Sequence, residues 1–199
     1  MIRAAKMRVA FLAAAFAFAC GGPAFAQEGR AYLGAGIGQA KADGVCDEIR
    51  TLVTGFGSVS SCDEKDTAWK LFGGYRFNPN FALEGTYVDY GSIKANGQTF
   101  GVPFSISGDA SAFGLAAVGI LPLANRVSVF GKLGLLRTEI DVTASGVGGA
   151  GSESESDTGL HIGIGVMFDI GQNFSVRAEW ERNDEAEIDM MSIGVQFRF

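Results

Sequence analysis

The stretch GLHIGIGVMF, residues 159–168, alternates apolar residues with small or polar ones without a break. Its apolar set is Leu160, Ile162, Ile164, Val166 and Phe168. A period of two places alternate residues on opposite faces of a β-strand. RVSVFGKLGLL, residues 126–136, and TAWKLFGGYRF, residues 67–77, repeat the pattern. Because residues 27–199 show no convincing amphipathic helix, the sequence predicts an all-β fold.

Eight segments alternate in this way, and most have about the ten residues that a tilted membrane-crossing strand needs. We expect strands near residues 30–41, 67–77, 81–90, 109–121, 126–142, 158–169, 174–183 and 188–199. Short turns at 78–80, 122–125 and 170–173 alternate with polar connections at 42–66, 91–108, 143–157 and 184–187. This rhythm puts all turns at one end and all long loops at the other. It predicts an eight-stranded antiparallel up-and-down transmembrane β-barrel.

The N-terminus has the layout of a secretory signal peptide. Basic residues precede an apolar run from Val9 to Cys20, and Ala24-Phe25-Ala26 offers small residues two apart. We therefore expect a cleaved signal over residues 1–26 and a barrel domain over 27–199. The run is about half the length of a membrane-spanning helix, which disfavours a retained anchor. A lipoprotein signal cleaved before Cys20 is a weaker alternative, because the preceding residues fit it poorly.

Charge and cysteine content limit the partners. Removing the three basic residues of the signal leaves 13 basic against 22 acidic residues, a net charge of −9 that makes nucleic acid an unsuitable partner. Cys46 and Cys62 lie in one polar stretch, and in an exported chain we expect them to form a disulfide. A metal site is disfavoured, since two thiols without an adjacent histidine are an incomplete ligand set.

Alternation alone leaves open whether the apolar face points into the barrel, as in a soluble lipocalin-type barrel, or outward to lipid. The residues that alternate with the apolar ones, and so share the opposite face of each strand, include many glycines. On a water-facing surface these glycines would weaken the strands, but inside a narrow barrel they make room for long side chains. The same face also carries both signs of charge. These residues are Lys70, Arg76, Glu84, Lys132, Arg177, Glu179 and Glu181. Opposite charges can pair in a lumen, so we expect the apolar face to point outward.

Aromatic residues gather at the ends of the predicted strands, as expected at membrane–water boundaries. The turn-side set is Tyr75, Phe77, Phe81, Phe168, Phe174, Phe197 and Phe199, and the loop-side set is Trp69, Tyr87, Tyr90 and Trp180. Every backbone group in lipid must be paired, so the last strand should pair with the first. Phe199 then lies at the lipid boundary.

Two pieces, KLFGGYRFNPNFALEGTYVDYG at 70–91 and FSVRAEWERND at 174–184, resemble a hairpin and the seventh strand of the OmpA-like transmembrane β-barrel family of Gram-negative outer membranes. The resemblance covers nearly all of 27–199. It implies that a lumenal cluster of charges plugs the barrel. The network expected here is Lys70, Glu84, Lys132, Arg177 and Glu179.

Within this network the resemblance implies that Glu84 pairs with Arg177 or Lys132. The resemblance also implies a further glutamate in the gating network of the family. This chain has Met167 at that position and therefore departs from the full network. The resemblance also implies that Phe197 and Phe199 belong to a signal read by the barrel-assembly machinery. No peptidoglycan-binding domain is expected after the barrel.

We therefore expect an outer-membrane protein with a structural or surface-interaction role. Its expected partners are outer-membrane lipid, lipopolysaccharide, the assembly machinery and an extracellular ligand at the loops; no cofactor is expected. A small channel is the alternative, although eight strands leave an interior just wide enough for side chains. A lipid-modifying enzyme is less favoured, because His161 points into the barrel with no serine partner beside it. The acidic run at 151–157 favours a solvated loop over a calcium site.

Overall fold

The structure is a computed structural model that describes residues 30–42, 44, 46–47, 50–51, 54–55, 57–63, 65–99, 102–146 and 149–199. The predicted signal peptide lies outside them. The strands in the described part are β1 Arg30–Ala42, β2 Gly57–Asp63, β3 Lys65–Asn78, β4 Phe81–Thr99, β5 Val102–Ala124, β6 Val127–Gly146, β7 Gly149–Asp169, β8 Phe174–Asn183 and β9 Ile188–Arg198. No helix in the described ranges is both long and apolar enough to cross a membrane.

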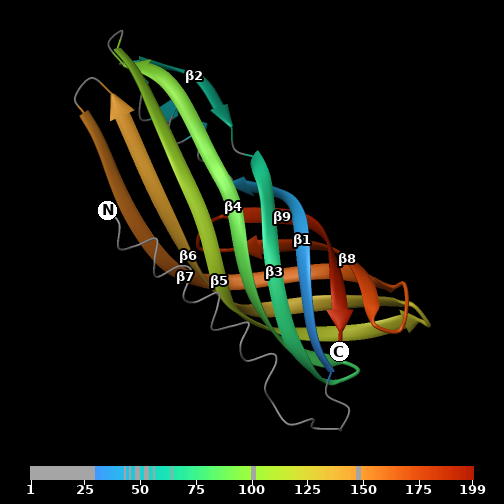
Figure 1. Cartoon of the computed structure of the whole chain (residues 1–199). Coiled ribbons are helices and arrows are strands. Elements are labelled where there is room, and N and C mark those ends of the chain that lie inside the picture. Colours follow the sequence, from blue (N-terminus) through green and yellow to red (C-terminus); the bar gives the residue numbers. More distant parts are fainter. Residues whose placement is uncertain are drawn as a thin grey trace.

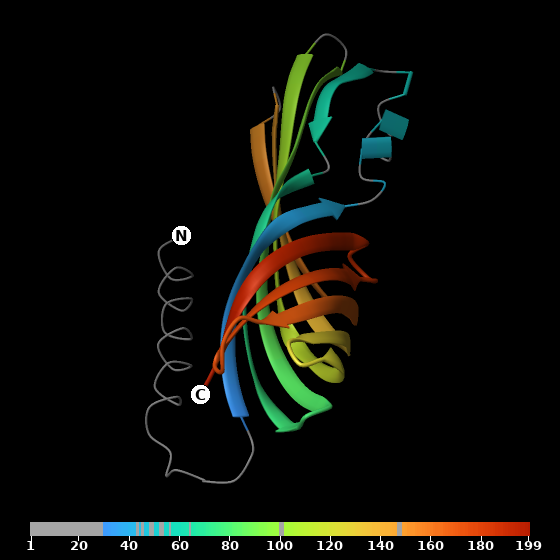
Figure 2. The same cartoon turned by 90° about the vertical axis from the view of Figure 1, so that its right-hand side faces the viewer.

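Eight of the strands close into a ring, visible at the lower part of Figures 1 and 2. The hydrogen-bonded order is β4-β3-β1-β9-β8-β7-β6-β5, and pairing of β5 with β4 completes the circle. The predicted contact between the first and last strands is present: β1 pairs antiparallel with β9 from Tyr32 opposite Arg198 to Ala42 opposite Ile188. The predicted eight-stranded antiparallel barrel is therefore confirmed. Closure leaves the ring without an edge strand, as a bilayer requires.

Two of the predicted loops, 91–108 and 143–157, are wrong, because all of their described residues lie in strands. The β4–β5 ladder continues through residues 91–108 to Thr99 opposite Val102. The β6–β7 ladder likewise continues through 143–157 to Gly146 opposite Gly149. Together β4 to β7 form a sheet that rises beyond the barrel (Figure 2), and we call this part the extension. Ladder hydrogen bonds join backbones, so a hairpin can propagate through serine, glycine and glutamate without an apolar face.

The predicted loop 42–66 also contains a strand. β2 pairs with β4 from Gly57 opposite Thr99 to Asp63 opposite Lys94, and so covers the β4 edge of the extension. Below it, β4 pairs with β3 up to Asp89, where a bulge shifts the register. Gly91 follows with φ +79°, a conformation that favours glycine. The Asp66 carboxylate accepts a hydrogen bond from the Ser92 amide at 2.7 Å, which anchors the bend where the extension begins.

The outer face of the barrel is apolar and exposed, as the parity argument predicts. Among its large side chains are Leu33, Ile37, Leu71, Leu83, Leu115, Leu133, Leu135, Ile164, Val166, Ile193 and Val195. The turn-side aromatics are also exposed, and ring contacts join Phe174 to Phe197 and Phe197 to Phe199. The placement of Tyr90 in the loop-side aromatic set was wrong. Tyr90 shares its parity with Glu84 and is buried in the lumen.

Candidate functional site: a charge layer inside the barrel

The barrel interior is arranged in three layers along its axis. An apolar layer near the turns consists of Tyr32, Phe72, Ala82, Val118, Ile120, Phe130 and Met167. A second apolar layer near the extension consists of Ala40, Ala42, Ala68, Val88, Tyr90, Ala112, Leu136, Ile188 and Met190. Charged side chains fill the space between them. Lys70 shows how this arises, because it is one inward position from Phe72 on one side and from Ala68 on the other.

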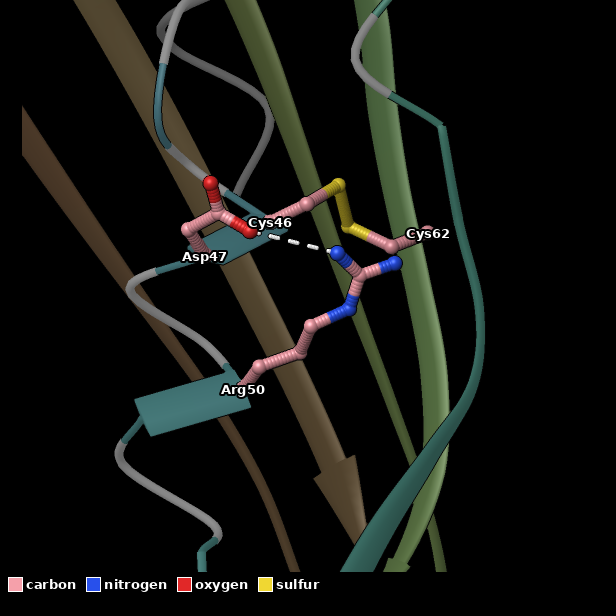
Figure 3. Close-up of a disulfide and its surroundings, with 4 residues drawn as sticks. All are labelled: Cys46, Asp47, Arg50 and Cys62. Carbon is pink, nitrogen blue, oxygen red and sulfur yellow. Dashed lines mark hydrogen bonds and ion pairs between the residues drawn. A yellow bond between two sulfur atoms is a disulfide. The ribbon is translucent and has the colours of Figure 1, made fainter.

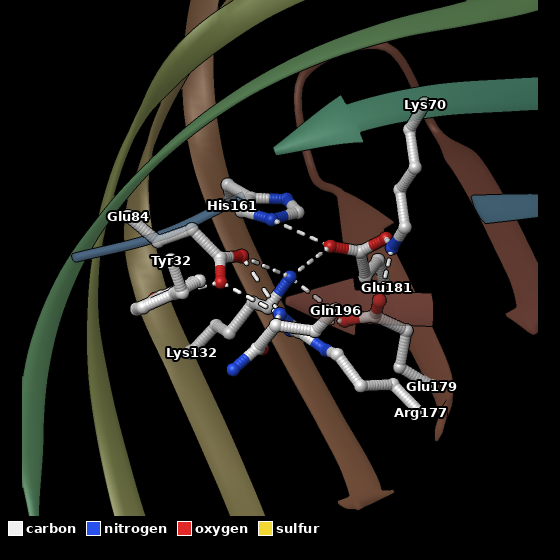
Figure 4. A network of polar contacts seen from close by, with 9 residues as sticks. All are labelled: Tyr32, Lys70, Glu84, Lys132, His161, Arg177, Glu179, Glu181 and Gln196. Carbon is white, nitrogen blue, oxygen red and sulfur yellow. Dashed lines mark hydrogen bonds and ion pairs between the residues drawn. The ribbon is translucent and has the colours of Figure 1, made fainter. Parts of the chain in front are cut away.

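The charge layer brings together all five residues of the expected lumenal network (Figure 4). Glu84 contacts two cations: its carboxylate lies 2.8 Å from Arg177 and 2.7 Å from Lys132. The sequence proposed Arg177 or Lys132 as its partner, and the structure shows both. Glu179 extends the chain of contacts, at 3.1 Å from Arg177, 2.7 Å from Lys132 and 2.5 Å from Lys70.

Glu181 completes the cluster, although it is absent from the expected network. It lies 2.9 Å from Lys132 and forms an ion pair with Lys70. The cluster therefore contains three carboxylates and three basic side chains, Lys70, Lys132 and Arg177. Lys70 and Glu84 are both fully buried, at 0% exposure. Six buried charges are tolerable only when their attractions offset the loss of water, so balance and mutual contact are both necessary.

Polar and aromatic neighbours support the charges. Tyr32 donates a hydrogen bond from its hydroxyl to Glu84 at 2.9 Å, and Arg177 donates one to Gln196 at 3.3 Å. The Arg177 guanidinium carbon lies 4.2 Å from the Phe72 ring centre and 4.5 Å from that of Phe130. Both rings belong to the turn-side apolar layer, so cation–π attraction holds Arg177 against that layer.

Glycines make room for these side chains, as the sequence analysis proposed. A Cβ on Gly34 would collide with the Phe72 ring, and one on Gly74 would lie 2.6 Å from the Tyr32 hydroxyl. Gly34 is paired with Phe72, and Gly74 with Tyr32, in the β1–β3 ladder, so each glycine leaves room for a bulky inward side chain of the neighbouring strand. The parity pattern therefore predicted both the large residues and the gaps that accept them.

His161 is a further ionisable residue near the layer that the expected network did not include. Its side chain is 3% exposed, and Nε2 lies 3.3 Å from Glu181, while Nδ1 has no hydrogen-bond partner in the part of the chain that the structure describes. Parity alone placed His161 in the lumen. The signal that could have found Glu181 and Tyr32 was the same: each occupies an inward position on its strand.

The two cysteines lie outside the barrel. Cys46 and Cys62 form a disulfide with a Cα–Cα distance of 5.9 Å (Figure 3). Cys62 belongs to β2, and Cys46 lies in a short helical segment where Arg50 and Asp47 form an exposed ion pair at 3.2 Å. The bridge thus ties this segment to the strand that covers the β4 edge.

A closed eight-stranded ring, an apolar outer belt and a filled interior define the class of outer-membrane β-barrels. The chain belongs to the outer membrane protein beta-barrel domain family, which it matches over residues 11–199. The resemblance drawn from the sequence is thereby confirmed, and membership supports an outer-membrane location. No curated protein sequence matches the chain.

Solved structures show the same fold at low sequence identity. Ail, the attachment invasion locus protein of Yersinia pestis, is similar at a TM-score of 0.55 and 22% identity, over 87% of this chain and 100% of Ail. OprG of Pseudomonas aeruginosa is similar at a TM-score of 0.53 and 12% identity, over 86% of this chain and 96% of OprG. The N-terminal barrel of Pseudomonas aeruginosa OprF is similar at a TM-score of 0.51 and 14% identity, over 85% of this chain and 97% of the OprF barrel.

Proposed function

We propose that this protein is a closed outer-membrane barrel with a structural or surface-interaction role. The supporting observation is the three-layered interior, in which a balanced charge cluster lies between two apolar layers. A conducting path would require two apolar layers to open and buried ion pairs to separate. Separation would leave charges such as Glu84 and Lys132 uncompensated in a low-dielectric space, which is costly.

Ion conductance tests this proposal directly. Purified protein inserted in planar lipid bilayers should give no stable conductance, and Glu84→Gln, which unbalances the layer, should raise the frequency of transient openings. Glu155→Gln in the extension is the matched control and should behave as the unaltered protein. A large, sustained conductance of the unaltered barrel would favour the small-channel alternative instead.

We propose that the extension is the part that meets partners outside the cell. One of its edges is covered by β2, whereas the opposite edge, in β7, pairs with no other strand of the described residues until His161 lies opposite Asn183. Along that edge Glu153, Glu155 and Asp157 alternate with serines and are exposed. An extracellular ligand that pairs with such an edge would add a strand to the sheet.

The charge of the extension limits the chemistry of this ligand. Ail has been crystallised in complex with the heparin analogue sucrose octasulfate, a polyanion. The acidic β7 edge would repel such a molecule, so we expect a neutral or cationic partner here. Binding of immobilised cationic peptides by the unaltered protein, weakened by raised salt and by Glu155→Lys, would support this. Equal binding of sulfated polysaccharide would contradict it.

We propose no catalytic role. His161 is enclosed in the lumen, and its ionisable neighbour is Glu181, which two lysines already engage. A hydroxyl nucleophile for acyl transfer would have to lie within hydrogen-bond reach of the histidine, and the two nearest inward positions on β7 are glycines, Gly159 and Gly163. Lipid A of unchanged mass in cells that express the protein is the expected result.

The exposed belt supports partnership with outer-membrane lipid and lipopolysaccharide, and we propose Phe197 and Phe199 as part of the assembly signal. Both rings face outward at the end of β9, where Phe174 packs against Phe197. Phe199→Ala should slow folding into bilayers that contain the assembly machinery more than folding into detergent micelles. Phe81→Ala, which removes another exposed aromatic, is the control.

A further inference from the structure

A second group of charges lies at the turn end of the lumen, which faces the periplasm in barrels of this family. Arg30, Arg76 and Arg198 occupy inward positions there. Arg30 is directly opposite Arg76 in the β1–β3 ladder, and Arg198 is opposite Tyr32, the next inward residue of β1. Asp169, at the end of β7, is the acidic residue among them.

Only one of the three guanidinium groups is neutralised. Arg198 forms an ion pair with Asp169 at 2.8 Å, and Ser175 donates a hydrogen bond to the same carboxylate at 2.6 Å. Within the described residues, the side chains of Arg30 and Arg76 make no hydrogen bond or ion pair. Arg76 is attracted by Asp169 but repelled by both Arg198 and Arg30.

This end of the lumen therefore differs from the charge layer above it. The charge layer matches three cations with three carboxylates, whereas the turn end of the lumen has three guanidinium groups and one side-chain carboxylate. Arg76 and Arg198 lie opposite Ala82 and Tyr32 of the turn-side apolar layer, and within the described residues no ion pair joins them to the carboxylates of the charge layer.

Two buried nitrogen atoms of these arginines have no hydrogen-bond partner in the part of the chain that the structure describes. They are Nε of Arg76 and Nε of Arg198, and both are donors. A buried donor without an acceptor loses free energy that a suitable acceptor would restore. Arg198 is 7% exposed and forms its ion pair with Asp169, while Arg76 is only partly buried.

We propose that the periplasmic mouth binds a phosphate group, held by Arg76 and Arg198 with Arg30 at the rim. Guanidinium forks match the geometry of phosphate oxygens, and a doubly charged oxyanion would supply the acceptors that Arg30 and Arg76 lack among the described side chains. The phosphate can come from a soluble phosphate ester or from a phospholipid headgroup of the inner leaflet. The outward neighbours Tyr75 and Phe77 lie at the lipid boundary, so a headgroup would have to fold over the rim to reach Arg76.

The test uses the folded barrel in alkyl-glucoside micelles, which contain no phosphate. Inorganic phosphate is titrated while backbone amide NMR shifts at the ends of β1, β3 and β9 are followed. We expect saturable shifts at millimolar phosphate or below, and a loss of affinity of about tenfold or more in Arg76→Gln. Arg76 has no ion-pair partner, so this substitution leaves no uncompensated charge and folding should be retained; heat-modifiable gel mobility checks this.

Arg126→Gln is the matched control, because Arg126 lies exposed in the β5–β6 turn at the same end. It should bind phosphate as the unaltered protein does. The proposal is overturned if chloride at equal ionic strength produces the same shifts, if no saturation occurs, or if Arg76→Gln and Arg126→Gln bind equally. Once binding is seen, repeating the titration in nanodiscs with and without phosphatidylglycerol separates the sources: competition identifies the lipid headgroup, and its absence identifies a soluble phosphate.

Discussion

Strands β4 to β7 pass through two regions, the barrel and the extension, in which the two faces of each strand have different surroundings. Inside the barrel, each strand has a lipid-facing apolar side and a packed lumenal side. In the extension the same strands continue in water, and β7 carries a serine and glutamate alternation there. The comparison teaches that the backbone ladder is common to both regions, whereas side-chain packing is concentrated in one. Substitutions should therefore be costly in the barrel and nearly silent in the extension.

The largest effect is expected from Glu84→Gln. It removes one of three carboxylates and leaves Arg177 and Lys132 with a buried excess of positive charge, which should lower the free energy of unfolding by about 3–5 kcal/mol. Urea titration of the lipid-refolded protein, followed by gel mobility with and without heating, measures this. Glu155→Gln, an exposed residue of the extension, should leave the urea midpoint unchanged. Equal midpoints for the two variants would refute the importance of charge balance.

A smaller loss is expected from Gly165→Val, which tests how tightly the lumen is packed. A Cβ at this position would lie 2.7 Å from the Ala178 carbonyl oxygen and would also meet the Phe130 ring. Overpacking of this kind should cost about 1–3 kcal/mol. The matched change in the extension is Gly151→Val, where no atom lies within 4 Å of the added carbon. If both variants unfold at the same urea concentration, the lumen is looser than the structure indicates.

Removing the disulfide should affect the extension alone. In the double variant Cys46→Ser, Cys62→Ser, β2 loses its tie to the helical segment and should separate more often from β4. We expect faster proteolysis within residues 43–63 and an unchanged urea midpoint of the barrel, because β2 is not part of the ring. A matching loss of barrel stability would mean that the two regions unfold together. Reduction of the unaltered protein serves as an independent check.

The smallest effect is expected from Arg50→Ala. Its ion pair with Asp47 is exposed to solvent, and such pairs contribute about 0.5 kcal/mol or less. Proteolysis of residues 43–63 should proceed at the rate of the unaltered protein. Faster cleavage would show that this pair supports the disulfide-linked segment more strongly than its exposure suggests.

The sequence predicted the barrel better than the extension for a physical reason. Alternation reports a difference between two faces, and such a difference exists where one face meets lipid and the other meets the lumen. Residues 151–157 form a strand with water on both sides, so their composition resembles a loop. The prediction for Tyr90 was wrong for a related reason. Its aromatic ring suggested a place at the membrane–water boundary, whereas its position on the strand directs it into the lumen.

The sequence predicted which residues belong to the lumenal site, but not how they are arranged in it. Parity placed Lys70, Glu84, Lys132, Arg177 and Glu179 on one face, and it did the same for Glu181, Arg76 and Arg198. Parity has no information on height along the barrel axis, because strands are staggered relative to one another. The ion pairs of the folded chain show that six of these charges meet in one cluster, whereas Arg76 and Arg198 lie opposite Ala82 and Tyr32 of the turn-side apolar layer.

Two facts about this protein follow from residue order alone: which side chains face lipid and which face inward, and that eight such strands form one barrel. Both depend on local geometry, since successive side chains of a strand point to opposite faces of the sheet. The balanced charge layer, the unbalanced arginines at the mouth and the strands that continue into water were decided by tertiary structure. They depend on which strands are neighbours and at what stagger, and those relations join residues that are distant in the chain.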